Sequence, residues 1–196
     1  ARGASAIDDP EWLAYLDEAS THLGLVRPVR LLSSPAAVVP VVYGLRQGVV
    51  LLPTDAAEWP EDRRRAFLLH ELAHVSRHDC LTQTLGHIAR LLYWPNPLAW
   101  WLVRRMRAEA ERACDDRVLS SGTSASDYAA HLLEAARDLK RAERPLAVLA
   151  VVERSRLEDR LLALLDPGLR RGSLTRRSLG FGVASSLLLV ASIATL

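Results

Sequence analysis

The pentapeptide His70-Glu71-Leu72-Ala73-His74 contains the residue types of a zinc hydrolase at the spacing that the chemistry needs. An α-helix rises 1.5 Å per residue, so two histidines four apart lie on one face, about 6 Å from each other along the axis. Their imidazoles can bind one zinc ion from the same side, and the glutamate can reach a water in the open position of the metal. The pattern predicts metal ligands at His70 and His74 and a catalytic carboxylate at Glu71.

A catalytic zinc takes a third protein ligand, and the motif E-R-A-C-D at residues 111–115 offers one. Glu111 follows His74 by 37 residues (111 − 74). A second helix packed antiparallel to the first can bring its carboxylate to the metal. Asp115 lies one turn further along the same face, where it can accept the second N–H of a zinc-bound histidine. The alternative is a solvated charged face, and Glu109 competes from another face of the helix.

The remaining histidines are weaker candidates. On a straight helix, His78 lies about 12 Å along the axis from His70, whereas zinc–nitrogen bonds are about 2 Å long. We therefore interpret His78 as solvated or as a partner of a ligand. No local pattern supports His87 or His131 as a ligand, and His22, near a helix end, is interpreted as a surface residue.

Composition sets the class of protein. The 196 residues suit one domain, or one domain with an appendage, and 49% hydrophobic with 24% charged residues is ordinary for a globular protein. A net charge of +2 gives no general case for nucleic-acid binding. Cys80 and Cys114 form no C-x-x-C pair, so we expect free, inert thiols in a reducing compartment, not a secreted disulfide-bonded domain.

The C-terminal residues Leu179 to Leu196 contain no charge and directly follow an arginine-rich stretch. Eighteen helical residues span about 27 Å, close to the hydrocarbon thickness of a bilayer. We expect a membrane span, with the preceding domain in the cytoplasm by the positive-inside rule; a buried core helix is the alternative. Because the chain ends within the apolar run, we expect it to be part of a longer membrane protein. The expected division is a zinc metallopeptidase domain at 1–168, a basic linker at 169–178 and a transmembrane helix at 179–196.

Cap and turn signals predict a mainly α fold with one small β-sheet (α+β). Asp9 followed by Pro10 is a helix start, Asn96 followed by Pro97 is another, and Ser124 with Asp127 forms a capping-box pattern. Pro40 lies within a β-branched run and cannot donate to a ladder, so that strand should lie at an edge or carry a bulge. The expected strands cover 29–32, 38–43 and 49–52; the expected helices cover 10–22, a helix opening at Pro60 that carries the zinc motif, 81–93, 97–119, 124–141 and 153–165.

An aromatic cluster lies between two of these helices. Tyr93, Trp94, Trp100 and Trp101 occur among leucines, with arginines following at 104, 105 and 107. Core packing is one interpretation. The other is an interfacial patch that lies against a membrane, with the arginines facing headgroups.

Several separate motifs occur in the order found in a known family. The H-E-x-x-H at 70–74, Asp79, Y-W-P-N-P at 93–97 and E-R-A-C-D at 111–115 together resemble the BlaR/MecR-type integral-membrane metallopeptidases. The likeness extends upstream to 44–53 and downstream to 126–128. It implies a gluzincin-like, cytoplasmic zinc domain between transmembrane helices, with Zn²⁺ bound by His70, His74 and Glu111, a catalytic Glu71 and an orienting Asp115.

The chemistry follows from these roles. Zinc lowers the pKa of bound water toward about 7 and polarises the scissile carbonyl, and Glu71 takes the proton and later delivers it to the leaving amine. Glu111 should be ionised to act as a ligand. Tyr128 and His131 share a helix face and are candidate donors to the oxyanion, with ordinary helix packing as the alternative.

The resemblance implies a bacterial inner-membrane protease that acts in signalling. Such proteins cleave a cytoplasmic transcriptional repressor, directly or indirectly, and some cleave themselves before the last membrane helix. No S-x-x-K motif of penicillin-binding domains is present, so β-lactam sensing is not inferred. The alternatives are a housekeeping protease that removes damaged membrane proteins and a catalytically silent metal-binding sensor or scaffold.

Overall fold

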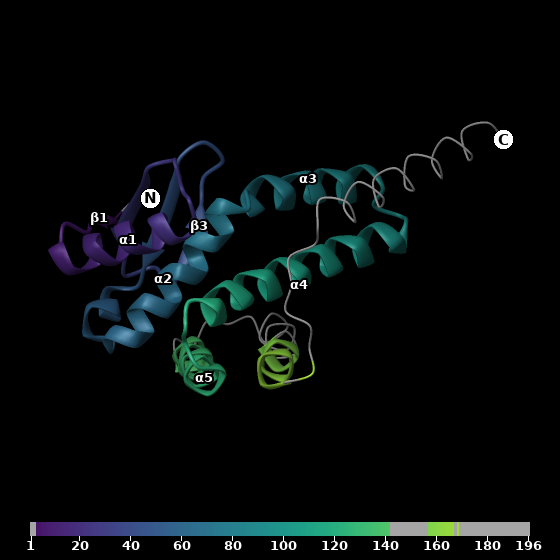
Figure 1. Ribbon diagram of the computed structural model, residues 1–196. Helices are drawn as coiled ribbons and strands as arrows, with labels where there is room; N and C mark the ends of the chain where they lie inside the picture. The colour runs from purple at the N-terminus through teal and green to yellow at the C-terminus, as the bar shows by residue number, and fades with distance from the viewer. Residues whose placement is uncertain (1–2, 142–156, 167, 169–196) are drawn as a thin grey trace.

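The computed structural model describes residues 3–141, 157–166 and 168, and shows a mainly helical chain with one small mixed sheet (Figure 1). This confirms the α+β class. Within the part of the chain that is described, no helix combines the length and apolarity needed to cross a bilayer. The predicted linker at 169–178 and transmembrane helix at 179–196 lie outside the described residues.

The sheet has four strands in the order β1-β2-β4-β3. The central strands β2 (Val29–Ser33) and β4 (Gly48–Leu52) are parallel, and β1 (Ser5–Ala6) and β3 (Val41–Tyr43) pair antiparallel on either side. β3 is an edge strand, as Pro40 predicted. The two-residue β1 was not predicted, because it is too short to show an alternating pattern.

The core joins the sheet to the first two long helices. Helix α1 (Pro10–His22) begins where Asp9 Oδ1 accepts the Glu11 N–H at 2.8 Å, and it packs against α2 (Glu61–Ser76). A short 3₁₀ helix, η1 (Thr54–Glu58), leads into α2. Burial of apolar surface between these elements anchors α2, the helix with the zinc motif. The buried core includes Trp12, Tyr15, Leu31, Val50, Leu52, Leu68 and Leu72.

The helical backbone is interrupted between α2 and α3 (Asp79–Leu92). His78 adopts a left-handed conformation, with φ 60° and ψ 35°, and its side chain is exposed. A left-handed residue ends one helix and redirects the next. Helix α3 therefore begins at Asp79, two residues earlier than the predicted start at Leu81.

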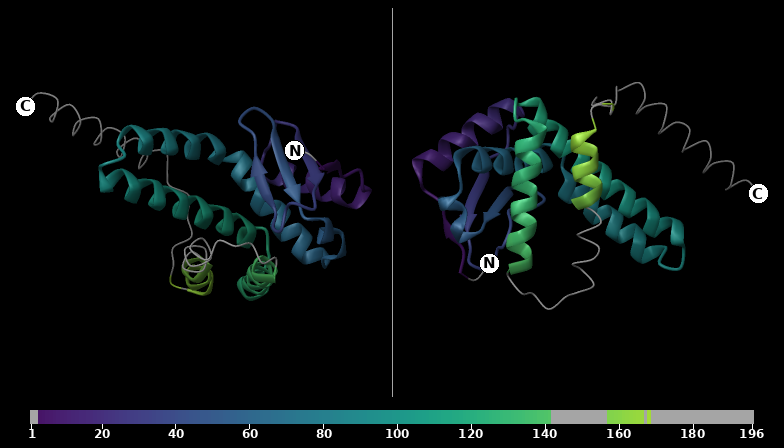
Figure 2. Two further views of the ribbon diagram at one scale, coloured as in Figure 1. Left: turned by 180° about the vertical axis from the view of Figure 1, so that it is seen from behind. Right: turned by 90° about the horizontal axis from the view of Figure 1, so that it is seen from below.

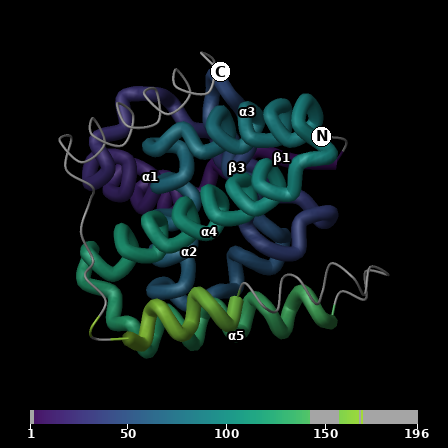
Figure 3. Tube along the Cα trace, turned by 90° about the vertical axis from the view of Figure 1, so that its right-hand side faces the viewer, coloured from purple at the N-terminus to yellow at the C-terminus, as the bar shows by residue number. Residues whose placement is uncertain are grey.

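Helices α3 and α4 (Pro97–Ser120) form a hairpin, and α4 returns past α2 in the opposite direction (Figure 1). Asn96 Oδ1 accepts the Leu98 N–H at 2.9 Å, which confirms the predicted cap of α4. Helix α5 (Ala125–Arg141) and a helix at 157–165 lie on the side of α4 opposite to α3 (Figures 2 and 3). The latter is the described part of the helix predicted at 153–165.

Candidate metal centre

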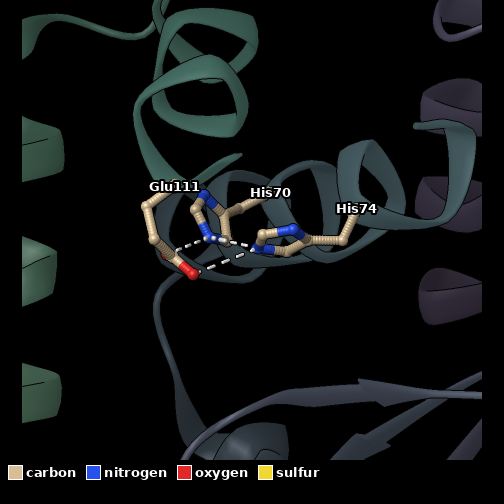
Figure 4. A group of neighbouring side chains, drawn as sticks. All are labelled: His70, His74 and Glu111. Atoms are coloured by element: carbon tan, nitrogen blue, oxygen red, sulfur yellow. Dashed lines mark hydrogen bonds and ion pairs between the residues drawn. The ribbon is translucent and has the colours of Figure 1, made fainter. Parts of the chain in front are cut away.

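Helices α2 and α4 bring three ligand-type side chains together. His70 and His74, one turn apart on α2, direct their Nε2 atoms toward each other at 3.3 Å. Glu111 on α4 faces both, with Oε2 at 3.5 Å from His70 Nε2 and Oε1 at 3.8 Å from His74 Nε2 (Figure 4). Packing of α4 against α2 therefore closes the gap of 37 residues, as the sequence predicted.

This spacing fits a zinc ion. Two atoms that each lie about 2 Å from a tetrahedral metal are about 3.3 Å apart, and the three separations here are 3.3, 3.5 and 3.8 Å. Two imidazole nitrogens and one carboxylate oxygen are also a set of ligands that catalytic zinc uses, with the fourth position left for water. The three residues can thus hold a metal ion with little movement.

The other ring nitrogen of His70, Nδ1, contacts two buried side chains on the side of the ring away from Glu111. Its Nδ1 lies 3.2 Å from Asp115 Oδ1 and 2.9 Å from the Tyr128 hydroxyl, which itself donates to Asp115 at 2.9 Å. A proton kept on Nδ1 leaves the Nε2 lone pair free for a metal. Asp115 therefore lies where its predicted orienting role requires.

His74 has an equivalent partner, which the sequence reasoning did not assign. Its Nδ1 lies 2.8 Å from Asp79 Oδ2, and Asp79 is 3% exposed. On a continuous helix, residues five apart point about 140° away from each other. The left-handed turn at His78 removes that offset and brings Asp79 back to the ring. The only sequence signal was the presence of Asp79 in the family-like motif order.

Arg160, from the helix at 157–165, is the second residue that sequence reasoning missed. Its guanidinium binds both carboxylate oxygens of Asp115, at 2.9 Å from Nε and 2.6 Å from Nη2. Its Nη1 lies 3.3 Å from Glu111 Oε2. Burial disfavours the ionised Asp115 carboxyl, but the His70 hydrogen bond and the Arg160 charge outweigh this and hold its pKa below the usual range.

The pKa of Glu111 is set by the same opposing effects of burial, hydrogen bonding and a nearby positive charge. Burial opposes its ionisation, yet the hydrogen bond with His70 and the charge of Arg160 lower the pKa of Glu111 to about 2. An ionised carboxylate is the form that binds a metal. The geometry thus provides the charged Glu111 that a metal site requires.

Glu71 is buried on α2 next to the two histidines, at 8% exposure. Burial raises its pKa, and the charges of His70 and His74 only partly oppose the shift. A carboxylate with a raised pKa is closer to the operating pH and is better suited to take and return a proton. Glu71 therefore has the environment expected of a general base.

The remaining predicted residues lie away from the Nε2 side of the histidines or have other partners. The buried Tyr128 hydroxyl contacts His70 Nδ1, a geometry that favours orienting the ring over reaching an oxyanion. His131 Nε2 is buried and makes no hydrogen bond within the described part of the chain. Glu109 is exposed and pairs with Arg105 and Arg112. His22 and His78 are exposed, and His87 contacts Arg107.

Cys114 belongs to a second group of possible ligands, with His74 and Asp79. Its Sγ lies 3.3 Å from His74 Nδ1, the ring nitrogen that already contacts Asp79. Burial raises the pKa of the Cys114 thiol far above its usual value, and metals bind the thiolate. The group with Glu111, on the Nε2 side of the histidines, is therefore the better candidate for a metal than the group with Cys114.

A small pocket at the edge of the sheet has His74 in its lining. It lies between the β3–β4 turn and the start of α3, and its lining includes Val42, Gly44, His74, Val75 and Cys80. The outer strand β3 therefore runs beside a hollow that has His74 in its lining.

The protonation of His70 predicts that the stability of the metal-free protein and its zinc affinity both depend on pH. Burial lowers the pKa of His70, but the hydrogen bonds to Asp115 and Glu111 outweigh it and raise the value to about 9. In the metal-free protein, His70 thus contributes stability that is complete below about pH 6.5 and is lost as pH rises through 9. A metal must displace this proton, so zinc affinity should rise about tenfold per pH unit up to pH 9.

Isothermal titration calorimetry with zinc at pH 7, in buffers of different ionisation enthalpy, measures this linkage. We expect about one proton released per zinc bound, and the same number for His87→Gln, whose imidazole lies outside the site. Binding without proton release at pH 7 would show that His70 is neutral before the metal arrives.

Comparison with known proteins identifies the relatives of this chain. The family model described as BlaR1 peptidase M56 matches residues 1–164. The chain is 30% identical over 115 residues to the Regulatory protein BlaR1 of Bacillus licheniformis, covering 59% of this chain and 19% of the relative. It is 33% identical over 81 residues to the Methicillin resistance mecR1 protein of Staphylococcus aureus, covering 41% of this chain and 14% of the relative.

The aligned parts thus span less than a fifth of the length of these relatives. The family match, in contrast, covers most of this chain and includes all three converging side chains, Glu71 and Arg160. The chain belongs to the BlaR1 peptidase M56 family.

Proposed function

We propose that this chain is the zinc-dependent endopeptidase portion of a membrane-anchored signalling receptor. The observation that carries the proposal is the convergence of His70 Nε2, His74 Nε2 and the Glu111 carboxylate, within 3.3–3.8 Å of one another. Each histidine is held from behind by a buried carboxylate, Asp115 or Asp79. Such preorganisation of ligands is typical of metal sites.

The residues around the site have separate roles in peptide hydrolysis. When bound, zinc lowers the pKa of water and polarises a carbonyl group. The Glu71 carboxylate accepts the proton of the attacking water and donates it to the leaving amine. Asp115 and Asp79 keep the protons of His70 and His74 on Nδ1. Arg160 holds Asp115 in place and contributes positive charge beside Glu111.

The signalling role rests on the relatives. One is named a regulatory protein and another a methicillin resistance protein. We infer that the zinc domain of this chain faces the bacterial cytoplasm and cleaves a transcriptional repressor, its own chain, or both. Self-cleavage would fall in the basic linker at 169–178. Intact-mass analysis of the incubated chain tests this, and a cut elsewhere would contradict it.

Metal removal tests the peptidase itself. The full chain, purified in detergent, should cleave members of a quenched fluorescent peptide library. Chelation should abolish cleavage, because Glu71 then lacks an activated water, and zinc added back in equimolar amount should restore it. The measurement is the initial rate, together with the zinc content of each sample.

Two outcomes would contradict the proposal. Cleavage that persists after the zinc content falls to zero would exclude metal-dependent hydrolysis. A chain that binds one zinc yet cleaves neither the library nor itself would instead be a metal-binding scaffold or sensor.

A further inference from the structure

The α3–α4 hairpin ends in a cluster of apolar side chains with more than half of their surface exposed. We call residues 91–102 the hairpin tip. It lies at the end of the hairpin away from the sheet (Figure 1). Exposure of this much contiguous apolar surface marks an interaction site. The exposed side chains are Leu91, Leu92, Tyr93, Trp94, Leu98, Trp101 and Leu102.

Specific contacts hold the two helices of the hairpin and its turn together. Gly86 on α3 lets the helices approach closely, since a Cβ there would lie 2.8 Å from Met106 Cε. Trp100 Nε1 donates to the Trp94 carbonyl at 2.8 Å, and the Arg90 guanidinium lies 4.5 Å from the centre of the Trp100 ring. The tip is thus a turn held by side-chain contacts, and its apolar side chains remain exposed.

The charge of the hairpin is one-sided. No Asp or Glu occurs between Asp79 and Glu109, although the chain has 23 acidic residues. The same stretch contains four arginines, at 90, 104, 105 and 107. Two copies of such a tip would repel each other, whereas arginine is attracted to anionic lipid headgroups. Tryptophan and tyrosine beside arginine are the side chains enriched at the membrane interface.

We propose that the hairpin tip docks into the interface of an anionic bilayer, with its aromatic and leucine side chains among the headgroups and upper acyl chains. Along α4, Trp101 and Glu111 are ten residues apart, which is about 15 Å. Docking therefore keeps the metal centre close to the membrane surface, within reach of membrane-proximal polypeptide segments. The inference does not depend on peptidase activity.

The native tryptophans report docking directly. Trp94, Trp100 and Trp101 lie at the tip, whereas Trp12 and Trp59 are buried in the body, and no tryptophan occurs in the predicted anchor at 179–196. The probe is the full chain reconstituted into vesicles of phosphatidylglycerol and phosphatidylcholine, with bromine placed near the top or the end of the acyl chains. We expect quenching, strongest with bromine near the top.

Two sets of variants separate the contribution of the apolar side chains to docking from that of the arginines. The double variant Trp94→Ser, Trp101→Ser should lose most of the quenching, while Leu13→Ser, Leu45→Ser, which alters exposed leucines of the body, should keep it. Arg104→Gln should reduce the ratio of docked to undocked tip on the order of fivefold. Matched changes at the exposed Arg27 and Arg30 should leave that ratio unchanged.

Three results would overturn the proposal. Tip tryptophans that remain unquenched in reconstituted vesicles would show that the tip stays in water. Emission that shifts with protein concentration in the absence of lipid would show that a second copy covers the tip. Quenching that is equal in neutral and anionic vesicles would remove the role of the arginines. Zinc affinity of each variant, measured in detergent, reports folding independently of docking.

Discussion

Replacing Glu71 with glutamine should reduce peptide cleavage by about 10²–10⁴-fold, the range contributed by a general base, while the protein keeps its zinc. Glutamine has the shape of glutamate but cannot accept the proton of the attacking water. Glu71 is not one of the three converging residues, so the geometry of His70, His74 and Glu111 should persist. Initial rates and zinc content, measured on the same samples of both proteins, test the prediction.

A matched control is Glu109→Gln, on the exposed face of α4, which should keep full activity. If Glu71→Gln stays active, another group takes the proton. If it loses zinc, Glu71 shapes the site. The uncleaved complex also reveals substrate position: a peptide bound to Glu71→Gln should protect the backbone amides of Val41–Tyr43 from hydrogen exchange, because β3 is the outer strand of the described sheet and lies beside the pocket. Unchanged exchange there would place the substrate elsewhere.

Replacing Arg160 with methionine should lower the free energy of unfolding by about 3 kcal/mol, because the Asp115 carboxylate stays buried without its bidentate partner. For a chain of this length the melting temperature should fall by about 6–12 °C. Zinc affinity should fall about 10–100-fold, since Asp115 no longer holds His70 firmly. Thermal unfolding by circular dichroism and competition with a chelator measure the two effects.

Measuring the pKa of His70 shows whether Arg160→Met alters the site itself or only destabilises the protein in general. The positive charge of Arg160 lowers this pKa, so Arg160→Met should raise it above about 9, by NMR titration of the metal-free protein. Arg160→Lys keeps the charge and should keep the pKa, but lysine cannot bind both oxygens, so stability should still fall. Arg137→Met, on the exposed face of α5, should change neither quantity. An unchanged His70 pKa in Arg160→Met would leave Arg160 with only a structural role.

Local patterns determined much of this protein in advance. Capping at Asp9 and Asn96 fixed where α1 and α4 begin, because these side chains bond to backbone N–H groups only two residues away. The spacing of His70 and His74 fixed their shared face, because the helix repeat alone decides it. Pro40 predicted the edge strand for the same kind of local reason. Each of these features depends on residues within one or two turns.

The tertiary structure decided the rest of the site. Only the packing of α4 against α2 selects Glu111 over Glu109, and only the left-handed turn at His78 returns Asp79 to His74. Arg160 reaches Asp115 across 45 residues, a contact without any periodic trace in the sequence. The sequence by itself therefore specified which chemistry the helices can present. The long-range packing, which brings residues from separate helices into one buried charge network, specified how that chemistry is held in place.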